Sequence, residues 1–286
     1  MTVTEVTDAR PSGPFDNSNL YGGYLCFNVF LALAAYSVLK VYPDREGRPL
    51  PALFRVSRPA LLPACLPVLL LGILSTGSRG ALVGTAAGLT ASLRWPRTLT
   101  LRRTVAVAVL IASVSVPFEW YFRQDPLVLI RVRRTAEGDA KGMTERLMLW
   151  QAAWDAFEAH PVLGVGYGQF RNYAHVATGE NKLAHQTYLS IAAELGVAGL
   201  LVFGYLFASV LRDTLNAKRG PYPGVTLAGR GYVVATLIQG MFNNVQHSRA
   251  LWICIGVLAA QSAAAGLGGA RASRRLELNG SVWRPP

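Results

Sequence analysis

The residues best suited to do chemistry in this chain surround a histidine at the start of a long apolar run. His185 is followed by Gln186, nine further residues, and then Gly196 and Gly199. An imidazole titrates near neutral pH, so a neutral histidine can accept a proton from a hydroxyl group. Because residues 189–211 are apolar and long enough to cross a bilayer, we predict a base at a membrane surface that acts on a hydroxyl such as that of a sugar.

Three ionisable residues lie within or at the ends of apolar runs, namely Arg79, Glu194 and Arg249. Charged groups are costly there, so each is a candidate site residue. Arg79 lies between Gly77 and Gly80, and a guanidinium binds phosphate through two parallel hydrogen bonds. We predict a pyrophosphate clamp at Arg79, with an arginine that snorkels to a membrane edge as the alternative.

Glu194 belongs to a polar stripe that it forms with Gln186 and Ser190 at a spacing of four residues. Residues at this spacing share one face of a helix, so the stripe should face other helices. Glu194 lies about half a turn round the helix from His185. We therefore expect Glu194 to pair with another helix or with backbone, rather than to orient His185.

The composition predicts a membrane protein. Of the 286 residues, 51% are hydrophobic and 15% are charged, and the mean hydropathy is +0.29. A soluble domain usually carries about 25% charged residues. All three cysteines lie in apolar runs, so we predict no disulfide framework and no metal site. The predicted spans are residues 20–39, 59–76, 79–94, 104–121, 187–211, 231–244 and 250–267.

The net charge of +12 is distributed in a way that predicts topology. The surplus of Lys and Arg gathers in four polar segments, whereas residues 119–184 are balanced. Cytoplasmic loops carry excess Lys and Arg, so seven crossings place these four segments inside and residues 119–186 outside. This topology explains the charge without nucleic acid and brings Arg79, Arg249 and His185 to the outer face. The basic segments are 40–58, 94–103, 212–230 and the tail.

The fold predicted from these patterns is all-α, a polytopic membrane helix bundle of about seven spans with a large helical loop on the outer face. The expected organisation is a polar N-terminal segment (1–19), four spans (20–121), an extracytoplasmic loop (122–186), three spans (187–267) and a basic cytoplasmic tail (268–286).

The outer loop is expected to contain a helix that runs from Thr144 to about His160 and ends before Pro161. An apolar stripe along it predicts a surface that lies against a membrane or against a protein core. The glycine-rich stretch 164–170 has no preceding strand, which argues against a dinucleotide site and favours a tight turn. The stripe consists of Leu147, Trp150, Trp154 and Phe157.

Taken together, these motifs resemble the O-antigen ligase and O-antigen polymerase family of bacterial envelope glycosyltransferases. Four stretches match in the family's order. They are an Asn-rich start of a span (13–25), STGSRG (75–80), a helix with Arg and Trp followed by His-Pro and a glycine-rich turn (145–170), and the run that begins at His185 (185–200).

The resemblance implies a transferase of the cytoplasmic membrane that works at its outer face without a metal or another cofactor. The donor would be a glycan on undecaprenyl diphosphate, and the acceptor a lipid, polysaccharide or protein hydroxyl. Matched residue by residue, Arg79 and Arg146 would hold the diphosphate and His185 would take the acceptor's proton. Arg171 and Glu194 are further candidates for substrate binding.

Two alternatives stay open. The first is a polymerase of the same family, for which the acceptor is another lipid-linked glycan; the pattern after His185 favours a ligase. The second is a truncated, non-catalytic subunit that binds lipid-linked glycan. The chain starts near the middle of the family's plan, so a separate N-terminal half is an expected partner.

Overall fold

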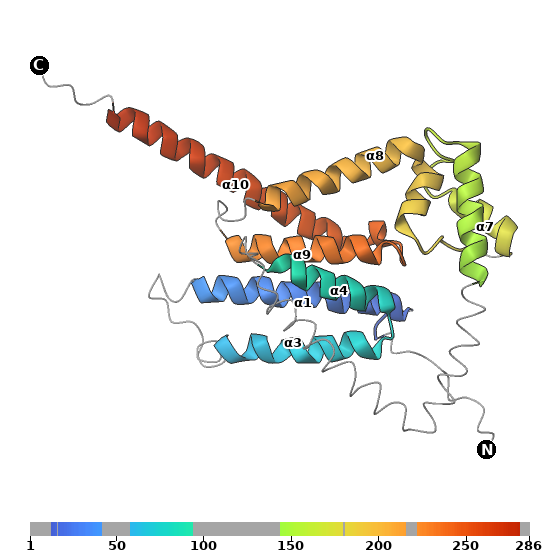
Figure 1. Cartoon of the computed structure of the whole chain (residues 1–286), viewed down its shortest axis with the longest axis horizontal. Helices are drawn as coiled ribbons and strands as arrows, with labels where there is room; N and C mark the ends of the chain where they lie inside the picture. Colours follow the sequence, from blue (N-terminus) through green and yellow to red (C-terminus); the bar gives the residue numbers. More distant parts are fainter. Residues whose placement is uncertain are drawn as a thin grey trace, which may run out of the picture.

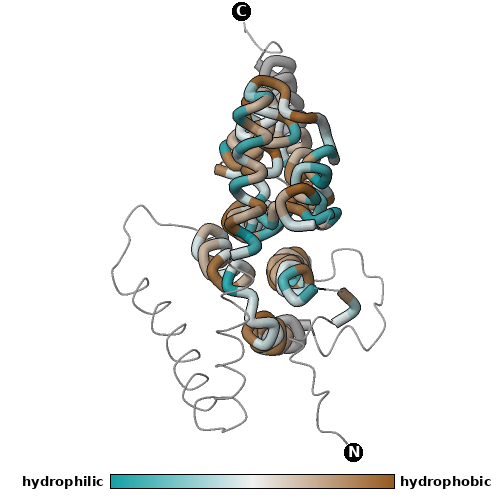
Figure 2. Tube along the Cα trace, turned by 90° about the vertical axis from the view of Figure 1, so that its right-hand side faces the viewer, coloured by the Kyte–Doolittle hydropathy of each residue, from teal (hydrophilic) through white to brown (hydrophobic). Residues whose placement is uncertain are grey.

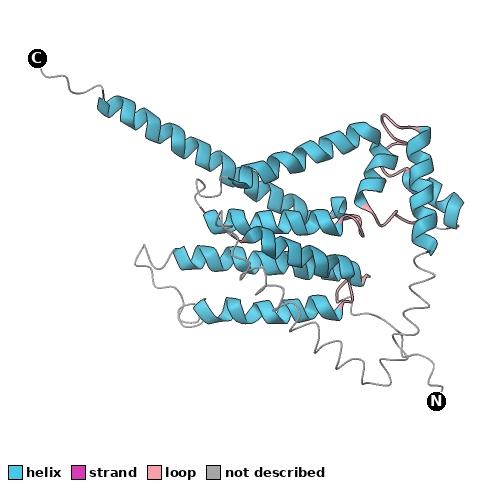
Figure 3. Cartoon of the chain, in the orientation of Figure 1, coloured by secondary structure: helices cyan, strands magenta, loops and turns pink. Residues whose placement is uncertain are grey.

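The computed structural model describes residues 13–15, 17–41, 58–93, 144–179, 181–215 and 222–280. In these ranges the regular structure is helical and contains no strand, which confirms the all-α part of the predicted fold class for the described residues (Figure 3). The elements are α1 (Ser18–Val41), α3 (Arg58–Ser75), α4 (Arg79–Ser92), a helix over residues 144–159, α7 (Phe170–Thr178), α8 (Thr187–Leu215), α9 (Pro223–Gln239), the short 3-10 helix η2 (Val245–His247) and α10 (Arg249–Gly280).

Helices α1, α3, α4 and α9 pack side by side along their length (Figure 1). The approach of α4 to α9 is the closest and depends on glycine. A Cβ atom on Gly88 would lie 2.4 Å from the carbonyl oxygen of Gly231, and one on Gly84 would lie 2.6 Å from that of Ala235. In membranes the burial of apolar surface gives little driving force for helix association, so close packing at small residues is important.

Six helix ends meet at one end of this bundle, which we call the site end: the starts of α1, α4, α8 and α10 and the ends of α3 and α9 (Figure 1). Close packing joins them. A Cβ on Gly22 of α1 would lie 3.1 Å from the Ser78 Cβ, before α4. A Cβ on Gly80 would lie 3.1 Å from the ring of Phe242, after α9. The bundle therefore collects turns from distant parts of the chain.

Among the residues that the structure describes, three helices are long and apolar enough to cross a membrane: Ser18–Val38, Thr187–Leu215 and Arg249–Gly266. Figure 2 shows hydrophobic segments on the helices of the bundle. Within α3, residues Cys65–Ser75 form a shorter apolar helix. The predicted span 104–121 lies outside the described residues. Helix α9 begins at Pro223 and ends at Gln239, so the predicted bounds 231–244 were wrong; proline is favoured in the first turn, and the chain turns after Gly240.

Helix α8 was predicted as one continuous span, but it is broken at Gly196. The backbone there has φ 63° and ψ −160°, and the helix changes direction (Figure 1). A Cβ atom at this position would lie 2.4 Å from the carbonyl oxygen of Val162. Only glycine tolerates both the left-handed φ and this approach. The part of α8 that continues as a regular apolar helix therefore starts after Gly196.

The loop over residues 161–166 packs across this break and satisfies the backbone groups that the break exposes. Backbone N–H and C=O groups without water need internal partners. The loop donates to the last carbonyls of the first half and accepts from the first N–H groups of the second half. The bonds are Val165 N–H to Ala193 O (2.9 Å), Gly166 N–H to Glu194 O (3.0 Å), Val197 N–H to Pro161 O (2.8 Å) and Ala198 N–H to Val162 O (3.2 Å).

The helix over residues 144–159 confirms the predicted loop helix, but it buries a different face. Its small residues pack on Phe170 and Ala174 of α7 and on Ala184. The predicted apolar stripe is partly outside: Leu147 is 54% exposed and Trp154 is 47% exposed. Core packing is therefore the wrong interpretation for these two side chains. Small side chains form the contact because they let the helices approach closely. The buried positions are Leu149, Ala152, Ala153 and Ala156.

Candidate functional site

His185 has a backbone conformation that is unusual for its residue type. Its φ is 51°, which makes it the one non-glycine residue with a positive φ in the described ranges. Histidine is among the residues enriched in this left-handed region, yet the conformation is strained and persists only when its surroundings hold it. Strained residues of this kind gather at functional sites. The neighbours on both sides show what holds His185.

The residues before His185 are anchored to the helix over residues 144–159. The indole N–H of Trp150 donates to the Ala184 carbonyl oxygen at 2.9 Å, and Ala184 is fully buried. The Lys182 ammonium forms an ion pair with the Glu145 carboxylate of the same helix. The apolar stripe in the sequence indicates Trp150 only as an apolar residue. The structure gives it a second role because its N–H fixes the segment that leads to His185.

The residues after His185 are anchored to the turn between α9 and α10. Thr187 is fully buried, and its hydroxyl donates to Asn243 O at 2.7 Å and accepts from Val245 N at 2.9 Å. Its own N–H donates to Gly240 O at 2.8 Å. No motif in the sequence marks Thr187 as a site residue. A hydroxyl in the first turn of an apolar helix is the signal that points to such a residue. His185 therefore lies between two fixed anchors.

The surroundings of His185 keep its imidazole neutral. Burial lowers the pKa of His185 below its ordinary value of 6.5, and the positive charge of Arg146 lowers it further. The Glu145 carboxylate acts in the opposite direction, and Lys182 adds a smaller lowering. A neutral imidazole can accept a proton, whereas an imidazolium cannot. At neutral pH His185 is thus in the form that a general base requires.

Arg146 is the predicted cation that the structure brings close to His185. Both side chains are half-buried, and the positive charge of Arg146 lowers the pKa of the His185 imidazole. A guanidinium beside a neutral base suits a reaction in which a hydroxyl loses a proton while a leaving group gains negative charge. This pairing spans almost forty positions of the chain. The two residues are brought together by the contacts of Trp150 with Ala184 and of Lys182 with Glu145, which hold the segment before His185 against the helix over residues 144–159.

Arg79 is the first residue of α4 and is exposed. The hydroxyls around it build the turn from α3. Thr76 donates to Ile73 O at 2.7 Å, Ser75 donates to Gly72 O at 2.8 Å, and the Ser78 hydroxyl accepts from Ala81 N–H. These groups therefore serve to place Arg79 at a helix N-terminus. Such a terminus favours anions, so the helix adds to the guanidinium's own attraction for them.

The connection from Arg79 to His185 runs through the turn after α9. Gly80 packs on Phe242, and Thr187 bonds the next residue, Asn243. Both residues are therefore held at the site end, and the charges that shift the pKa of His185 include those of Arg146, Glu145 and Lys182.

The two other predicted binding residues lie elsewhere. Arg171 is exposed on α7. Glu194 is 6% exposed, and its carbonyl oxygen accepts from Gly166 N–H at the break in α8. The backbone of Glu194 thus takes part in holding the 161–166 loop.

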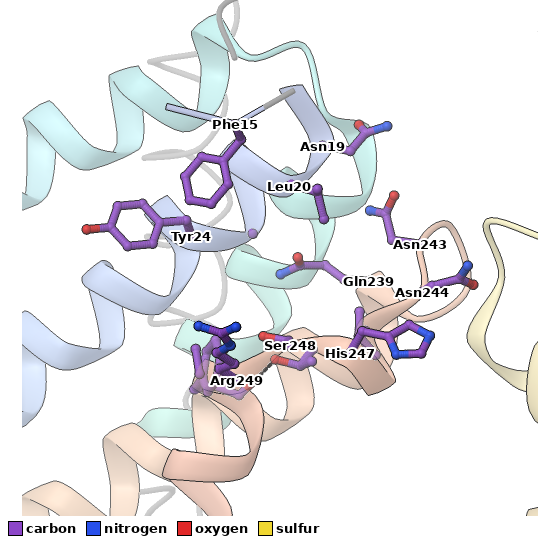
Figure 4. Close-up of a pocket in the computed structure, with 15 residues that line it drawn as sticks. Phe15, Asn19, Leu20, Tyr24, Gln239, Asn243, Asn244, His247, Ser248 and Arg249 are labelled. Carbon is purple, nitrogen blue, oxygen red and sulfur yellow. Dashed lines mark hydrogen bonds between the residues drawn. The ribbon is translucent and has the colours of Figure 1, made fainter. Parts of the chain in front are cut away.

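A pocket of about 490 Å³ opens at the site end, between the start of α1 and the turn from α9 to α10. This volume falls within the roughly 300–1,000 Å³ of small-molecule sites. Figure 4 shows the rings of Phe15 and Tyr24 on one side, the guanidinium of Arg249 on the other, and Gln239 between them. Arg249 was predicted as a candidate, whereas no motif in the sequence indicates Gln239.

The described residues contain no group of three or more His, Cys, Asp or Glu side chains placed to hold a metal ion.

Comparison with known proteins supports the family that the motifs suggested. No curated protein matches the chain. The model of the O-antigen ligase family matches residues 64–204. This stretch contains Arg79, Arg146 and His185, together with the glycine break in α8. It also contains the loop that closes over that break. Over residues 64–204 the protein belongs to the O-antigen ligase family.

Proposed function

We propose that this protein is a membrane glycosyltransferase of the ligase type. It moves a glycan from undecaprenyl diphosphate to an acceptor hydroxyl at the outer face of the cytoplasmic membrane. The observation that carries the proposal is His185, whose strained backbone is anchored on both sides and whose pKa is lowered by burial and by Arg146. A residue held in this way and kept neutral is suited to act as a base.

The proposed reaction needs one base and a place for negative charge. His185 takes the proton from the acceptor hydroxyl, and the hydroxyl oxygen forms a bond to the anomeric carbon of the donor sugar. The bond between that carbon and the diphosphate oxygen breaks as the diphosphate leaves. Arg146 and Arg79 stabilise the negative charge that develops on the leaving diphosphate. The inversion at the anomeric carbon requires the base and the cations on opposite faces of the sugar.

A polymerase of the same family would use the same groups with a second lipid-linked glycan as acceptor. The spacing His185, Gln186 and nine residues to Gly196 favours the ligase. The acceptor classes that suit the site are lipid, polysaccharide and protein hydroxyls.

The test is replacement of His185 by Asn and by Ala. Asparagine tolerates the left-handed backbone but cannot act as the base, so His185→Asn separates chemistry from folding. We expect transfer of labelled glycan from its lipid carrier in membranes to fall at least about a hundredfold for both variants. His175→Ala is the matched control because His175 is exposed on α7. Transfer at the wild-type rate by His185→Asn would refute the proposal.

A further inference from the structure

The loop that packs across the break in α8 carries two exposed apolar side chains at its tip. Val162 is 67% exposed and Leu163 is 73% exposed. Their backbone atoms contact the break itself, because Val162 O accepts from Ala198 N–H and a Cβ on Gly196 would lie 2.7 Å from Leu163 N. A single exposed apolar residue is common on protein surfaces. A neighbouring pair that backbone contacts hold in one place forms a fixed apolar surface.

This pair continues an exposed face of α8. Val197, Leu201 and Tyr205 follow the break at a spacing of four residues, so they lie along one side of the helix. They are 44%, 68% and 77% exposed. The N–H of Val197 donates to Pro161 O, which precedes Val162, so the face reaches the loop. The exposed side of the helix and the tip of the loop are therefore adjoining parts of one apolar surface.

The length of α8 sets the depth of this surface in a bilayer. After the break the helix has no charged residue before Arg212, which is exposed and lies 16 positions beyond Gly196. At 1.5 Å per residue these positions span about 24 Å, whereas the hydrocarbon core of a bilayer is about 30 Å thick. Figure 1 shows this part of α8 inclined to α9, and a tilt shortens the depth that a helix spans. With the Arg212 charge at one boundary, the break lies at or just within the opposite boundary.

The surroundings of the tip suit acyl chains rather than water. Irregular backbone is tolerated at this depth when its polar groups find partners, and the hydrogen bonds between the loop and α8 provide them. Val176 on α7 gives a contrast. It is 88% exposed, but Asn172 and His175 beside it on the helix are exposed and polar. The loop tip adjoins the exposed apolar face of a helix that can cross the membrane.

We propose that Val162 and Leu163 form a lipid-facing tip, which inserts among the upper acyl chains of the leaflet on the His185 side. The partner is the hydrocarbon of the bilayer, bound through apolar contact and without recognition of a headgroup. Burial of the two side chains in lipid stabilises the docked loop, and the docked loop completes the hydrogen bonds at the break in α8. The chain thus returns to the bilayer within the predicted extracytoplasmic segment 122–186. This contact does not depend on the proposed transfer chemistry.

The test uses a nitrobenzoxadiazole label on single cysteines of the full chain, in nanodiscs of phosphatidylethanolamine and phosphatidylglycerol. Leu163→Cys is compared with Val176→Cys in a Cys65→Ala background, in which Cys26 and Cys254 stay buried. We expect the label on Leu163→Cys to emit at shorter wavelength and to be quenched by lipids that carry a nitroxide on the upper acyl chain. Iodide should quench it at least about fivefold less than the label on Val176→Cys, because an anion is excluded from hydrocarbon.

Leu201→Cys supplies the reference for a side chain in the bilayer, since Leu201 is 68% exposed on α8. Two results would overturn the proposal. Equal iodide quenching of Leu163→Cys and Val176→Cys would place the tip in water. Protection from iodide without quenching by nitroxide lipid would show that protein covers the tip, either a second copy of this chain or another segment. If Leu163→Cys fails to fold, Val162→Cys takes its place with the same expected result.

His185→Asn separates this inference from the proposed function. That substitution should remove transfer and leave the quenching of labelled Leu163→Cys unchanged, because the loop contacts α8 at Gly196 rather than at His185. Transfer by a protein whose tip is open to iodide would reject the lipid contact and leave the proposed function intact. A tip that lipid quenches, in a protein that transfers no glycan, would do the reverse.

Discussion

At His185 two independent properties occur in one residue: a left-handed backbone and a pKa below the ordinary value. The first depends on hydrogen bonds made by neighbouring residues, and the second depends on burial and on Arg146. Together they fix where the imidazole is and which protonation state it has. A base needs both, because a proton acceptor must be within reach and uncharged when the acceptor hydroxyl arrives.

The lowered pKa of His185 predicts the acid limb of the pH profile. Activity that requires a neutral His185 should rise as pH increases through a midpoint below 6.5. Removing the charge in Arg146→Gln favours the imidazolium form, so the pKa rises and the midpoint should move to higher pH. The measurement is transfer rate against pH for both proteins. A midpoint that moves to lower pH in Arg146→Gln would contradict this account.

Trp150 is predicted to act as a positioning residue. Trp150→Phe keeps an aromatic ring but leaves the buried Ala184 carbonyl without its donor. We expect kcat to fall about tenfold with an unchanged KM for the lipid-linked donor, because the loss of about one hydrogen bond frees the segment before His185. Trp154→Phe is the control, since the indole of Trp154 donates to the exposed Glu158. Equal effects of the two substitutions would exclude a specific role for Trp150.

For single residues, the sequence predicted which side chains are candidates for the site but did not predict their contacts. His185, Arg79 and Arg146 were selected from their motifs and from the resemblance to a family. The partner of Trp150 lies 34 positions away in the chain, and Thr187 bonds residues 56 and 58 positions away. Such pairs depend on how the loop and the bundle fold. No local pattern in the sequence determines them.

At the scale of elements, the break in α8 and the 161–166 loop form one unit. The loop needs Gly164, whose Cβ would lie 2.3 Å from the backbone of Glu194, and the helix needs Gly196. Glycine is therefore required at both positions by the close approach of the two backbones. Hydropathy predicts residues 187–211 as one span because it does not report backbone angles. The glycine at 196 was the available signal, and it was counted only as part of a motif.

Gly196→Ala should disrupt this unit. Alanine at φ 63° is strained, and its Cβ would collide with Val162 O at 2.4 Å. We expect a destabilisation of at least about 2 kcal/mol and a matching loss of transfer, measured by thermal unfolding in detergent and by activity in membranes. Gly204→Ala is the control in the same helix, because a Cβ there meets nothing within 4 Å. A Gly196→Ala protein as stable as Gly204→Ala would contradict the described break.

At the scale of the whole molecule, the site end gathers three of the residues that charge counting assigned to the outer face. Arg79 and Arg249 begin α4 and α10, and His185 precedes α8 by two positions. The sequence could predict this alignment because each crossing reverses direction. It could not predict how closely α4 and α9 approach, since that depends on which glycines of the two helices meet.

The orientation of the bundle can be tested with single cysteines. In a Cys65→Ala background, Val176→Cys and Leu215→Cys place thiols at positions that are 88% and 72% exposed, while Cys26 and Cys254 stay buried. We expect a membrane-impermeant maleimide to label Val176→Cys in intact cells, and Leu215→Cys only after lysis. The background protein alone controls for the buried thiols. The opposite labelling pattern would place the site end in the cytoplasm.

The break in α8 also sets an order for biogenesis. During synthesis the loop emerges before α8, but it cannot dock until both halves of that helix exist. The half after Gly196 is a regular apolar helix that needs no contact with the loop beyond its first N–H groups. The half before Gly196 acquires its end contacts only through the loop. Because Thr187 bonds Asn243 and Val245, the anchor after His185 can form only once the turn from α9 to α10 has been synthesised.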